Sequence, residues 1–402
     1  MLSNMANAPQ PERCWREVAL DLPNCSHQKD PMLRLIHTAD WQLGKPYGRF
    51  DSDVRAALTE ARFDAIDALG RAAAENDAAH VLVAGDVFDT EGPEDRVIVQ
   101  AVSRMQRYAC TWWLLPGNHD FARNSGLWDR VRAKGATNVR ILTEPAPCEL
   151  EPGHWLLPAP LTHRHNLDDP TILFDTMATP GARLRIGLAH GSIRDFSSRG
   201  EAQNQIAPDR AQRSNLDYLA LGDWHGTLRV DARTWYSGTP ETDRFQRDEP
   251  GHALLVVLEP GVEPVVSPIR TGRFHWLTRD WAIPDVDGFA AECDRLLADV
   301  EPAATLLQLS LAGIVSLTER IAILARLEND LQHRLRHLGV RADDLVGRPS
   351  EQDLADLKVE GMLGTAAAKL IAMIDTGGGD AATAKRALER LFVEYHRGQD
   401  AA

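Results

Sequence analysis

Apolar residues dominate three short segments near the start of the chain, at residues 33–37, 80–86 and 111–120, and each segment ends in polar residues. Between them, residues 51–77 and 93–110 repeat apolar residues at the spacing of a helix with one covered face. Strands that alternate with helices in this way form a largely parallel sheet with helices packed on it. The polar ends of the strands then meet at one edge of the sheet, where open α/β sheets bind ligands.

The pattern continues with less helix after about residue 180. Two apolar segments, at residues 182–191 and 216–226, end in His190 and in Asp223 with His225. Three further segments resemble antiparallel strands and are expected to close a second sheet: residues 234–241, 252–261 and 262–272. Two sheets with helices outside them predict an α/β fold, a four-layer α/β/β/α sandwich.

The character of the chain changes after about residue 275. A helical pattern, an apolar strand and a long amphipathic helix within residues 276–348 predict a small α/β accessory domain. Residues 349–402 form a C-terminal segment with helical spacing on both sides of a Gly-rich stretch at 375–380. That stretch is expected to be a hinge between two helices, because no phosphate-loop Gly-Lys-Ser/Thr follows it. The main domain is then residues 32–275.

Residues 1–31 show neither helical nor strand periodicity and lack the apolar core of a signal peptide. Strand-like sequence begins abruptly at Met32. We therefore expect residues 1–31 to be a disordered or mis-assigned N-terminal extension, with translation starting at Met32.

The length and composition of the chain limit the number of domains and the classes of protein to which it can belong. A chain of 402 residues is expected to hold two or three domains, and none of its apolar runs reaches the roughly 18 residues of a membrane span. The formal net charge is −14, so contact with a polyanion has to come from a local basic surface or from bound metal. The five cysteines are widely spaced without a Cys-x-x-Cys pair, which favours a cytoplasmic location.

Residues that can bind metal ions follow five of the predicted strands. A single acid after a strand is usually a turn former or a helix cap, and a lone histidine is usually a hydrogen-bonded structural residue. Five such ends in series differ, because clustered carboxylates repel one another unless a cation lies among them. The candidates are Asp40 with Gln42, Asp86, Asn118 with His119 and Asp120, His190, and Asp223 with His225.

The segments ADWQLG, AGDVFD, PGNHD, AHG and LGDWHG together resemble the five phosphoesterase motifs of the calcineurin-like metallophosphoesterases. The sequence around the motifs, IHTADW at the first and YSGTPE after the last, is most similar to the SbcD-type DNA double-strand-break repair nuclease branch. The resemblance is strong over residues 32–275 and loose over the accessory domain.

This resemblance implies a site for two divalent metal ions. Asp86 would bridge both ions, and His119, oriented by Asp120, would lie outside the coordination sphere and assist the leaving oxygen. The first ion would be held by Asp40, Gln42 and His225. The second would be held by Asn118, His190 and Asp223.

Two positions depart from the family's pattern. Gln42 stands where the first motif usually has His, and Asp223 stands where the last motif usually has its first His. Ligand loss would make the chain an inactive scaffold, but both replacements still offer an oxygen donor. Gln42 is therefore expected to be a ligand, or a residue directly behind the ligands, of a working site. Three carboxylates with only two imidazoles favour manganese, with magnesium second, over zinc.

Aromatic and basic residues near the motifs have two interpretations. Trp41 and Trp224 either stack on a base or pack behind the site. Six basic residues either follow a phosphate backbone or form a solvated rim: Lys45, Arg49, Arg194, Arg199, Arg210 and Arg213. His37 is expected to be a hydrogen-bonded core residue, and residues 236–241 to shape the pocket.

Three functions stay open. The leading one is a metal-dependent DNA nuclease, exonuclease or endonuclease, that hydrolyses phosphodiester bonds with a two-metal-activated water in DNA repair. The second is a phosphodiesterase or phosphatase acting on small nucleotides, and the third is an inactive DNA- or ATPase-binding subunit. The resembling branch further implies that the C-terminal helices dock on an SbcC-like coiled-coil ATPase of the ABC type, and that the catalytic domain forms a homodimer.

Overall fold

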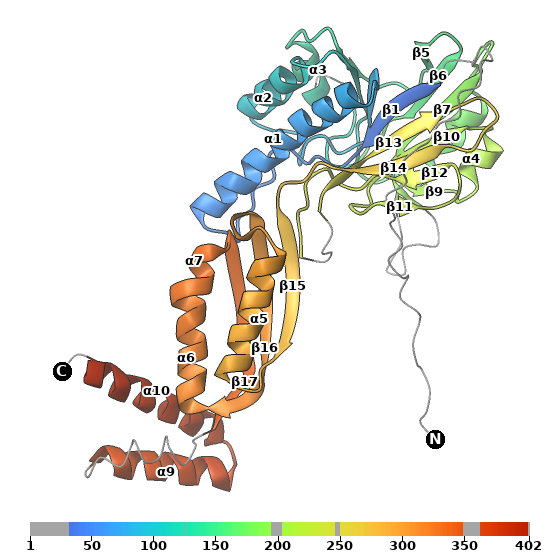
Figure 1. Cartoon of the computed structure of the whole chain (residues 1–402). Helices are drawn as coiled ribbons and strands as arrows, with labels where there is room; N and C mark the ends of the chain where they lie inside the picture. The colour runs from blue at the N-terminus through green and yellow to red at the C-terminus, as the bar shows by residue number, and fades with distance from the viewer. Residues whose placement is uncertain (1–31, 125, 194–202, 246–249, 349–361, 401–402) are drawn as a thin grey trace, which may run out of the picture.

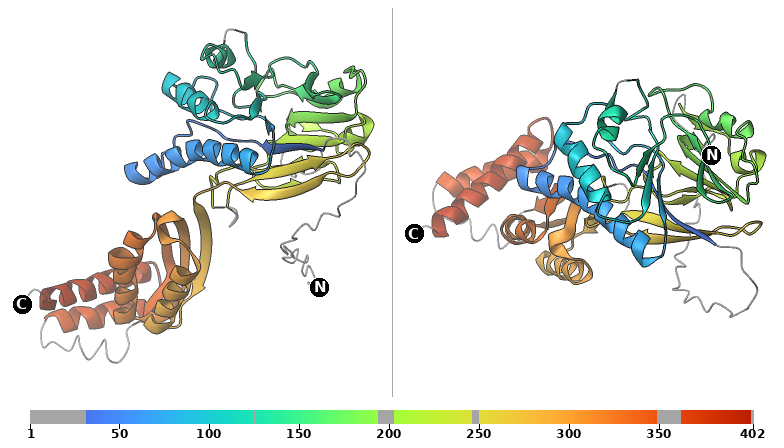
Figure 2. Two further views of the ribbon diagram at one scale, coloured as in Figure 1. Left: turned by 45° about the horizontal axis from the view of Figure 1, so that its top comes forward. Right: turned by 90° about the horizontal axis from the view of Figure 1, so that it is seen from above.

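The computed structural model describes residues 32–124, 126–193, 203–245, 250–348 and 362–400. The molecule is elongated: β1–β14 with α1–α4 form a first lobe, β15–β17 with α5–α7 form a second, and α9 and α10 lie at the end farthest from the first lobe (Figure 1, Figure 2). The predicted extension at residues 1–31 lies outside the described residues, as do Arg194 and Arg199. Within the described residues, no helix combines the length and the apolar character that a membrane crossing needs.

The first sheet has the strand order β14-β13-β1-β2-β3-β4. Its parallel part is formed by β1 (Leu33–Thr38), β2 (His80–Val83), β3 (Thr111–Leu114) and β4 (Val139–Ile141). Three helices cover its outer face: α1 (Ser52–Glu75), α2 (Asp95–Met105) and α3 (Leu127–Arg132). The predicted alternation of strands and helices is confirmed in this part of the chain.

The antiparallel edge of this sheet corrects the prediction that residues 252–272 close the second sheet. Strand β13 (His252–Leu258) pairs with β1, and β14 (Val265–Arg270) pairs with β13. Alternating residues of β13, such as Leu254 and Val256, are buried between the two sheets. The alternation was therefore interpreted correctly as a strand, but it does not reveal which sheet supplies the partner, because pairing is a long-range choice.

The second sheet has the order β11-β12-β10-β7-β6-β5. Its strands are β5 (Cys148–Glu151), β6 (His154–Ala159), β7 (Leu184–His190), β10 (Tyr218–Gly222), β11 (Leu228–Arg229) and β12 (Thr234–Tyr236). Its outer face is covered by η1 (Pro170–Asp175), α4 (Arg210–Arg213) and the small ribbon of β8 (Ser192–Ile193) and β9 (Gln205–Ile206). With a shared apolar core between the sheets, the predicted four-layer sandwich is confirmed.

The second lobe is a three-stranded parallel sheet with helices on one face (Figure 1). Its strands are β15 (His275–Ala282), β16 (Thr305–Ser316) and β17 (His337–Arg348). Helix α5 (Val286–Asp299) is followed by η2 (Pro302–Ala304), and α6 (Leu317–Arg326) continues through a π-helical turn, η3 (Leu327–Leu331), into α7 (Gln332–Arg334). A capping box of Ser316 and Glu319 starts α6. The predicted α/β accessory unit is confirmed.

The C-terminal helices are α9 (Met362–Thr376) and α10 (Ala381–Asp400). Gly377 and Gly378, with φ of 69° and 101°, end α9 in the left-handed region that glycine adopts freely. The two helices pack on α6 through Leu317, Ala367 and Leu388. The predicted break between two helices at residues 375–380 is confirmed.

A buried apolar cluster joins the two lobes. Phe50 and Leu58 of the first lobe pack against Phe274, Trp276 and Leu306 of the second. Each large apolar side chain buried in this way stabilises the fold by about 1.5–3 kcal/mol. The lobes are therefore held together by a continuous core at the start of β15.

Candidate metal centre

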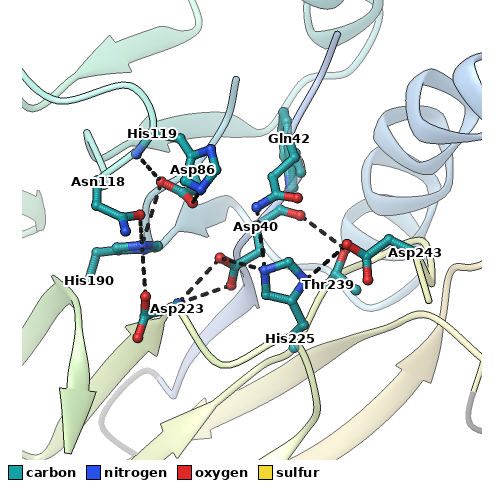
Figure 3. A network of polar contacts seen from close by, with 12 residues as sticks. Asp40, Gln42, Asp86, Asn118, His119, His190, Asp223, His225, Thr239 and Asp243 are labelled. Atoms are coloured by element: carbon teal, nitrogen blue, oxygen red, sulfur yellow. Dashed lines mark hydrogen bonds and ion pairs between the residues drawn. The ribbon is translucent and has the colours of Figure 1, made fainter. Parts of the chain in front are cut away.

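Loops that follow β1, β2, β3 and β10, together with the last residue of β7, meet at one edge of the two sheets (Figure 3). The first two loops are tied together by backbone hydrogen bonds, from Asp40 N to Gly85 O at 3.0 Å and from Gln42 N to Asp86 O at 2.9 Å. Several non-glycine residues here have positive φ: Asp40 at 55°, Gln42 at 43°, Asp86 at 54° and Asp223 at 99°. Such strained backbone is concentrated at functional sites in proteins.

The centre of this edge is a buried group of two acids and an imidazole. Asp40, Asp86 and His190 each offer a ligand atom, and these atoms all lie within 4.8 Å of one another. All three side chains are buried. Burial raises the pKa of Asp40 to about 6, although His225 and His190 oppose the shift. Buried acids in this arrangement require a positive charge among them.

His190 is oriented by the main chain. Its Nδ1 donates to the carbonyl oxygen of Ala84 at 2.8 Å, so Nε2 faces Asn118 Oδ1 at 3.1 Å and Asp86 Oδ1 at 3.5 Å. Burial alone would lower the pKa of His190, but the carboxylates of Asp86, Asp40 and Asp223 raise it to about 9. The fixed Nδ1–H leaves Nε2 as the ring atom directed at the carboxylates, which is the arrangement that metal-binding histidines use.

The loop after β2 can approach the His190 ring closely because residue 85 is glycine. Gly85 has a φ of 89°, and a Cβ built on it would lie 2.2 Å from His190 Nδ1. The second-sheet loop makes a similar contact, since the backbone N of Asp223 donates to the Asp40 carboxylate at 3.1 Å. Ser192 Oγ in turn donates to Asp223 Oδ2 at 2.7 Å. The Asp223 carboxylate is thereby directed toward His190, with Oδ1 3.8 Å from Nε2.

His225 is held by an acid that the sequence did not single out. Its Nδ1 lies 3.2 Å from Asp243 Oδ2, and its Nε2 lies 3.8 Å from Asp40 Oδ1. Arg244 also approaches Nδ1, at 2.8 Å, and would require the opposite tautomer, because a guanidinium only donates. The tautomer with its proton on Nδ1, accepted by Asp243, is the one that leaves Nε2 able to bind a cation.

The environment of Asp243 favours its ionised form. Burial alone would raise the pKa of Asp243, but the hydrogen bond and charge of His225, with Arg62 and Lys45, hold that pKa well below its usual range. The residue lies two positions after the YSGTPE segment. An acid at that place looks like any loop acid in the sequence, so only its contact with His225 identifies it.

His119 lies at the solvent side of the group, with its side chain 30% exposed. Nδ1 donates to the carbonyl oxygen of Asp89 at 2.8 Å, and Nε2 lies 3.9 Å from Asp86 Oδ2. The backbone N of His119 donates to Asp86 Oδ1 at 2.9 Å. The ring therefore presents Nε2 to the open side of the acids.

The expectation that Asp120 orients the His119 ring needs correction. The Asp120 carboxylate accepts the backbone N–H groups of Gly117 at 2.7 Å and Phe88 at 3.0 Å. Burial and the nearby charge of Asp86 raise the pKa of Asp120 to about 7. Asp120 thus joins the loops after β2 and β3, and the carbonyl of Asp89 takes the role that had been expected of it.

Gln42 lies in the second of the two places open to it, behind the ligands of the first ion. Its Oε1 accepts a hydrogen bond from Lys45 Nζ at 2.7 Å, and its Nε2 lies 3.4 Å from His225 Nε2. The amide oxygen that could bind the first ion therefore faces Lys45 and not Asp40 or Asp86 (Figure 3). The predicted ligands whose donor atoms approach one another are Asp40, Asp86, Asn118, His190, Asp223 and His225.

The structure distinguishes exposed from buried residues among the aromatic and basic candidates near the motifs. Trp41 is 1% exposed and packs edge-on against Trp112, so it is not available for stacking on a base, whereas Trp224 is 44% exposed. Arg210 is buried in ion pairs with Asp169 at 2.8 Å and Asp175 at 3.1 Å, which excludes it from a phosphate-binding rim.

Two other signals have structural explanations. The Arg49 guanidinium lies 4.8 Å from the ring centre of Phe50. His37 is fully buried and hydrogen-bonded to Tyr218 Oη and to the carbonyl oxygen of Leu221, which confirms it as a core residue.

The model of one protein family, described as calcineurin-like phosphoesterase, matches residues 33–257, which is more than half of the chain. The chain belongs to the calcineurin-like phosphoesterase family. It is therefore grouped with hydrolases of phosphoester bonds that use divalent metal ions. The donor set fits such ions, because the ligand atoms of two buried acids and of His190 all lie within 4.8 Å of one another.

Two relatives of this phosphoesterase carry a more specific description. The SbcD subunit of nuclease SbcCD from Escherichia coli K12, and its counterpart from Escherichia coli O157:H7, are each 35% identical over 91 residues. The match spans 22% of this chain and 21% of each relative, so the chain covers about a fifth of their length. Among solved structures, TT1561 of Thermus thermophilus is 8% identical with a TM-score of 0.39, covering 60% of this chain and 100% of that one, a likeness too low to support any conclusion.

Proposed function

We propose that this phosphoesterase is a metal-dependent DNA nuclease that hydrolyses phosphodiester bonds with water as the nucleophile. The observation that carries the proposal is the convergence of Asp40, Asp86 and His190 in a family of phosphoester hydrolases. The partial likeness to the SbcD subunit supports DNA as the substrate. Since the fold serves several substrate classes, this choice depends on experiment.

The proposed ligands divide around Asp86, which would be shared by the two ions. Asp40 and His225 would hold the first ion, and Asn118, His190 and Asp223 would hold the second. When bound, two divalent ions lower the pKa of a water molecule and stabilise charge on the phosphoryl oxygens. Three carboxylates and an amide oxygen beside two imidazoles favour manganese, with magnesium second.

His119 is the proposed general acid. Its Nδ1–H is committed to the Asp89 carbonyl oxygen, so the proton available for transfer is the one on Nε2. That atom lies on the open side of Asp86, where the leaving oxygen of a bound diester would be. A positioned acid of this kind accelerates a reaction by about a hundred- to ten-thousandfold.

The second lobe and the C-terminal helices are proposed to serve the macromolecular substrate and a partner. We assign residues 32–275 to catalysis, 276–348 to an accessory domain and 349–402 to docking. Leu363 and Met373 of α9 are 42% and 43% exposed, although α9 packs on α6 through other residues. These exposed apolar side chains are consistent with docking on an SbcC-like ATPase. A homodimer of the catalytic domain is proposed from the likeness to the SbcD branch.

One observation favours a small nucleotide as the substrate instead. A cavity of about 170 Å³ lies beside His225 and is lined by Trp224, Thr227 and Arg244 among others. Such a cavity suits a single base next to the metal centre. A phosphodiesterase acting on small nucleotides is therefore the second candidate.

The deciding experiment offers Mn²⁺-loaded protein linear and hairpin DNA, and separately cyclic and linear nucleotide diesters. DNA cleavage that is lost in Asp86→Ala and His119→Ala supports the nuclease. Turnover of the small diesters alone supports the second candidate. Inactivity on every substrate, with and without an SbcC-like ATPase, would reject both and leave a binding subunit.

A further inference from the structure

Lys45 fixes the orientation of the Gln42 amide. Nζ of Lys45 lies 2.7 Å from Gln42 Oε1 and 2.5 Å from Asp243 Oδ2. An ammonium group only donates, so the atom of the amide that faces it has to be the oxygen. The NH₂ group of Gln42 is then the part directed into the site.

The local chain favours this pairing. Lys45 N donates to Gln42 O at 3.2 Å, which closes a turn of four residues. Gly44, the third residue of the turn, has a φ of 92°, as a type II turn requires. The turn places the Lys45 side chain beside that of Gln42. The Lys45 side chain is 26% exposed, and its second partner, the Asp243 side chain, is 2% exposed. The ammonium therefore bridges two side chains that both contact His225.

An amide NH₂ is a donor and does not bind metal ions. Here it lies 3.4 Å from His225 Nε2, the ring atom that faces Asp40. A nitrogen that accepts from Gln42 carries a lone pair, which agrees with the tautomer proposed for cation binding. When that lone pair is engaged by a cation, the Gln42 N–H has to find another acceptor in the site.

We propose that Gln42 is a hydrogen-bond donor to a phosphoryl oxygen of the substrate, held in that orientation by Lys45 as a positioning residue. This inference rests on the proposed two-metal function. It leaves Asp40, Asp86 and His225 as the protein ligands of the first ion. Donors aimed at oxygens that gain charge during reaction are an effective source of catalysis.

The test measures metal and anion binding separately by calorimetry. Mn²⁺ is titrated into wild-type, Gln42→Ala, Gln42→Glu and Asp86→Asn protein, and inorganic phosphate is then titrated into the Mn²⁺-loaded forms. For Gln42→Ala we expect two ions with Kd within about threefold of wild type and phosphate affinity lowered about tenfold. Gln42→Glu keeps an oxygen for Lys45 but removes the N–H, so its phosphate affinity should fall at least as far.

Lys45 is tested with the same readouts. Lys45→Met frees the Gln42 amide to rotate, so phosphate affinity should fall about tenfold while both ions still bind. Lys45→Arg keeps a cationic donor and should retain most of the wild-type phosphate affinity. Loss of one Mn²⁺ ion in Gln42→Ala, or unchanged phosphate affinity in Gln42→Glu, overturns the inference and leaves the metal-dependent function standing. Wild-type protein that binds no Mn²⁺, as Asp86→Asn is expected to behave, overturns both.

Discussion

Asp243 Oδ2 lies 3.2 Å from Nδ1 of His225. The same carboxylate oxygen is within reach of Lys45 and Arg62, so a single buried acid connects the imidazole to two cationic side chains. A carboxylate behind a metal-binding histidine sets the ring's tautomer and orientation. Asp243 is therefore the residue on which the proposed geometry of the first ion depends.

Asp243→Asn is expected to weaken Mn²⁺ binding about ten- to a hundredfold, because the amide no longer stabilises the Nδ1–H tautomer of His225. Titration calorimetry measures the change. Asp280→Asn, on an exposed position of β15, is the matched control and should bind Mn²⁺ as wild type does. Equal affinities in the two variants would contradict the role of Asp243.

His119→Ala is expected to lower kcat about a hundred- to ten-thousandfold on DNA while leaving Mn²⁺ stoichiometry unchanged. The reason is that Nε2 lies on the exposed side of Asp86, outside the group formed by Asp40, Asp86 and His190. As the control, kcat of the wild type and of His119→Ala is compared on a 4-nitrophenyl nucleotide diester. That leaving group needs little protonation, so the variant should be much less impaired on it. An equal loss on both substrates would argue against general acid catalysis.

Glu241→Ala is expected to destabilise the junction between the lobes. The buried carboxylate of Glu241 accepts the backbone N–H groups of Arg273 at 2.6 Å and Phe274 at 3.1 Å. Two buried donors left without partners lower the free energy of unfolding by about 2–4 kcal/mol. Urea denaturation measures it, with the exposed Glu263→Ala as control. A Glu241 variant as stable as the control would show that the carboxylate contributes little.

His37 is expected to make stability fall in acid. Burial lowers its pKa from 6.5 to about 3, so between these values the unfolded chain binds a proton that the folded protein does not. Its contribution is complete above about pH 6.5 and is lost by at most about 1.4 kcal/mol per pH unit below that.

Comparison with His37→Gln isolates this effect from the other acids of the protein, since the amide has no titration of its own. The difference in unfolding free energy between the two proteins, measured by urea denaturation at several pH values, should shift in favour of the variant as the pH falls. A difference that stays constant from about pH 7 to about pH 4.5 would contradict the assignment.

Much of the site could be predicted because it follows strand ends. Asp40, Asp86 and His190 come after apolar segments of parallel strands, and such strands deliver their carboxyl ends to one edge of a sheet. The hinge at Gly377 and Gly378 and the capping box at Ser316 are equally local signals. Each depends on residue types within a few positions of one another.

The pairing of β13 with β1 could not be predicted, because Leu258 and Leu33 are brought together across most of the first lobe. Strand alternation shows that one face is buried and leaves the partner open. Two helices and one strand of the accessory unit were predicted, whereas β15 and β17 are recognised only in the completed sheet.

The sequence alone determined which chemical groups reach the site, because spacing after a strand places an acid or an imidazole at its end. Only the tertiary structure decided how those groups are oriented. Lys45, held by Asp243, turns the oxygen of Gln42 away from Asp40 and Asp86, Asp243 supports His225 from the following loop, and Asp120 binds backbone instead of His119. The spacing of residues does not reveal which donor and acceptor meet, and a pairing such as that of Lys45 with Asp243, 198 positions apart, leaves no mark on the local pattern.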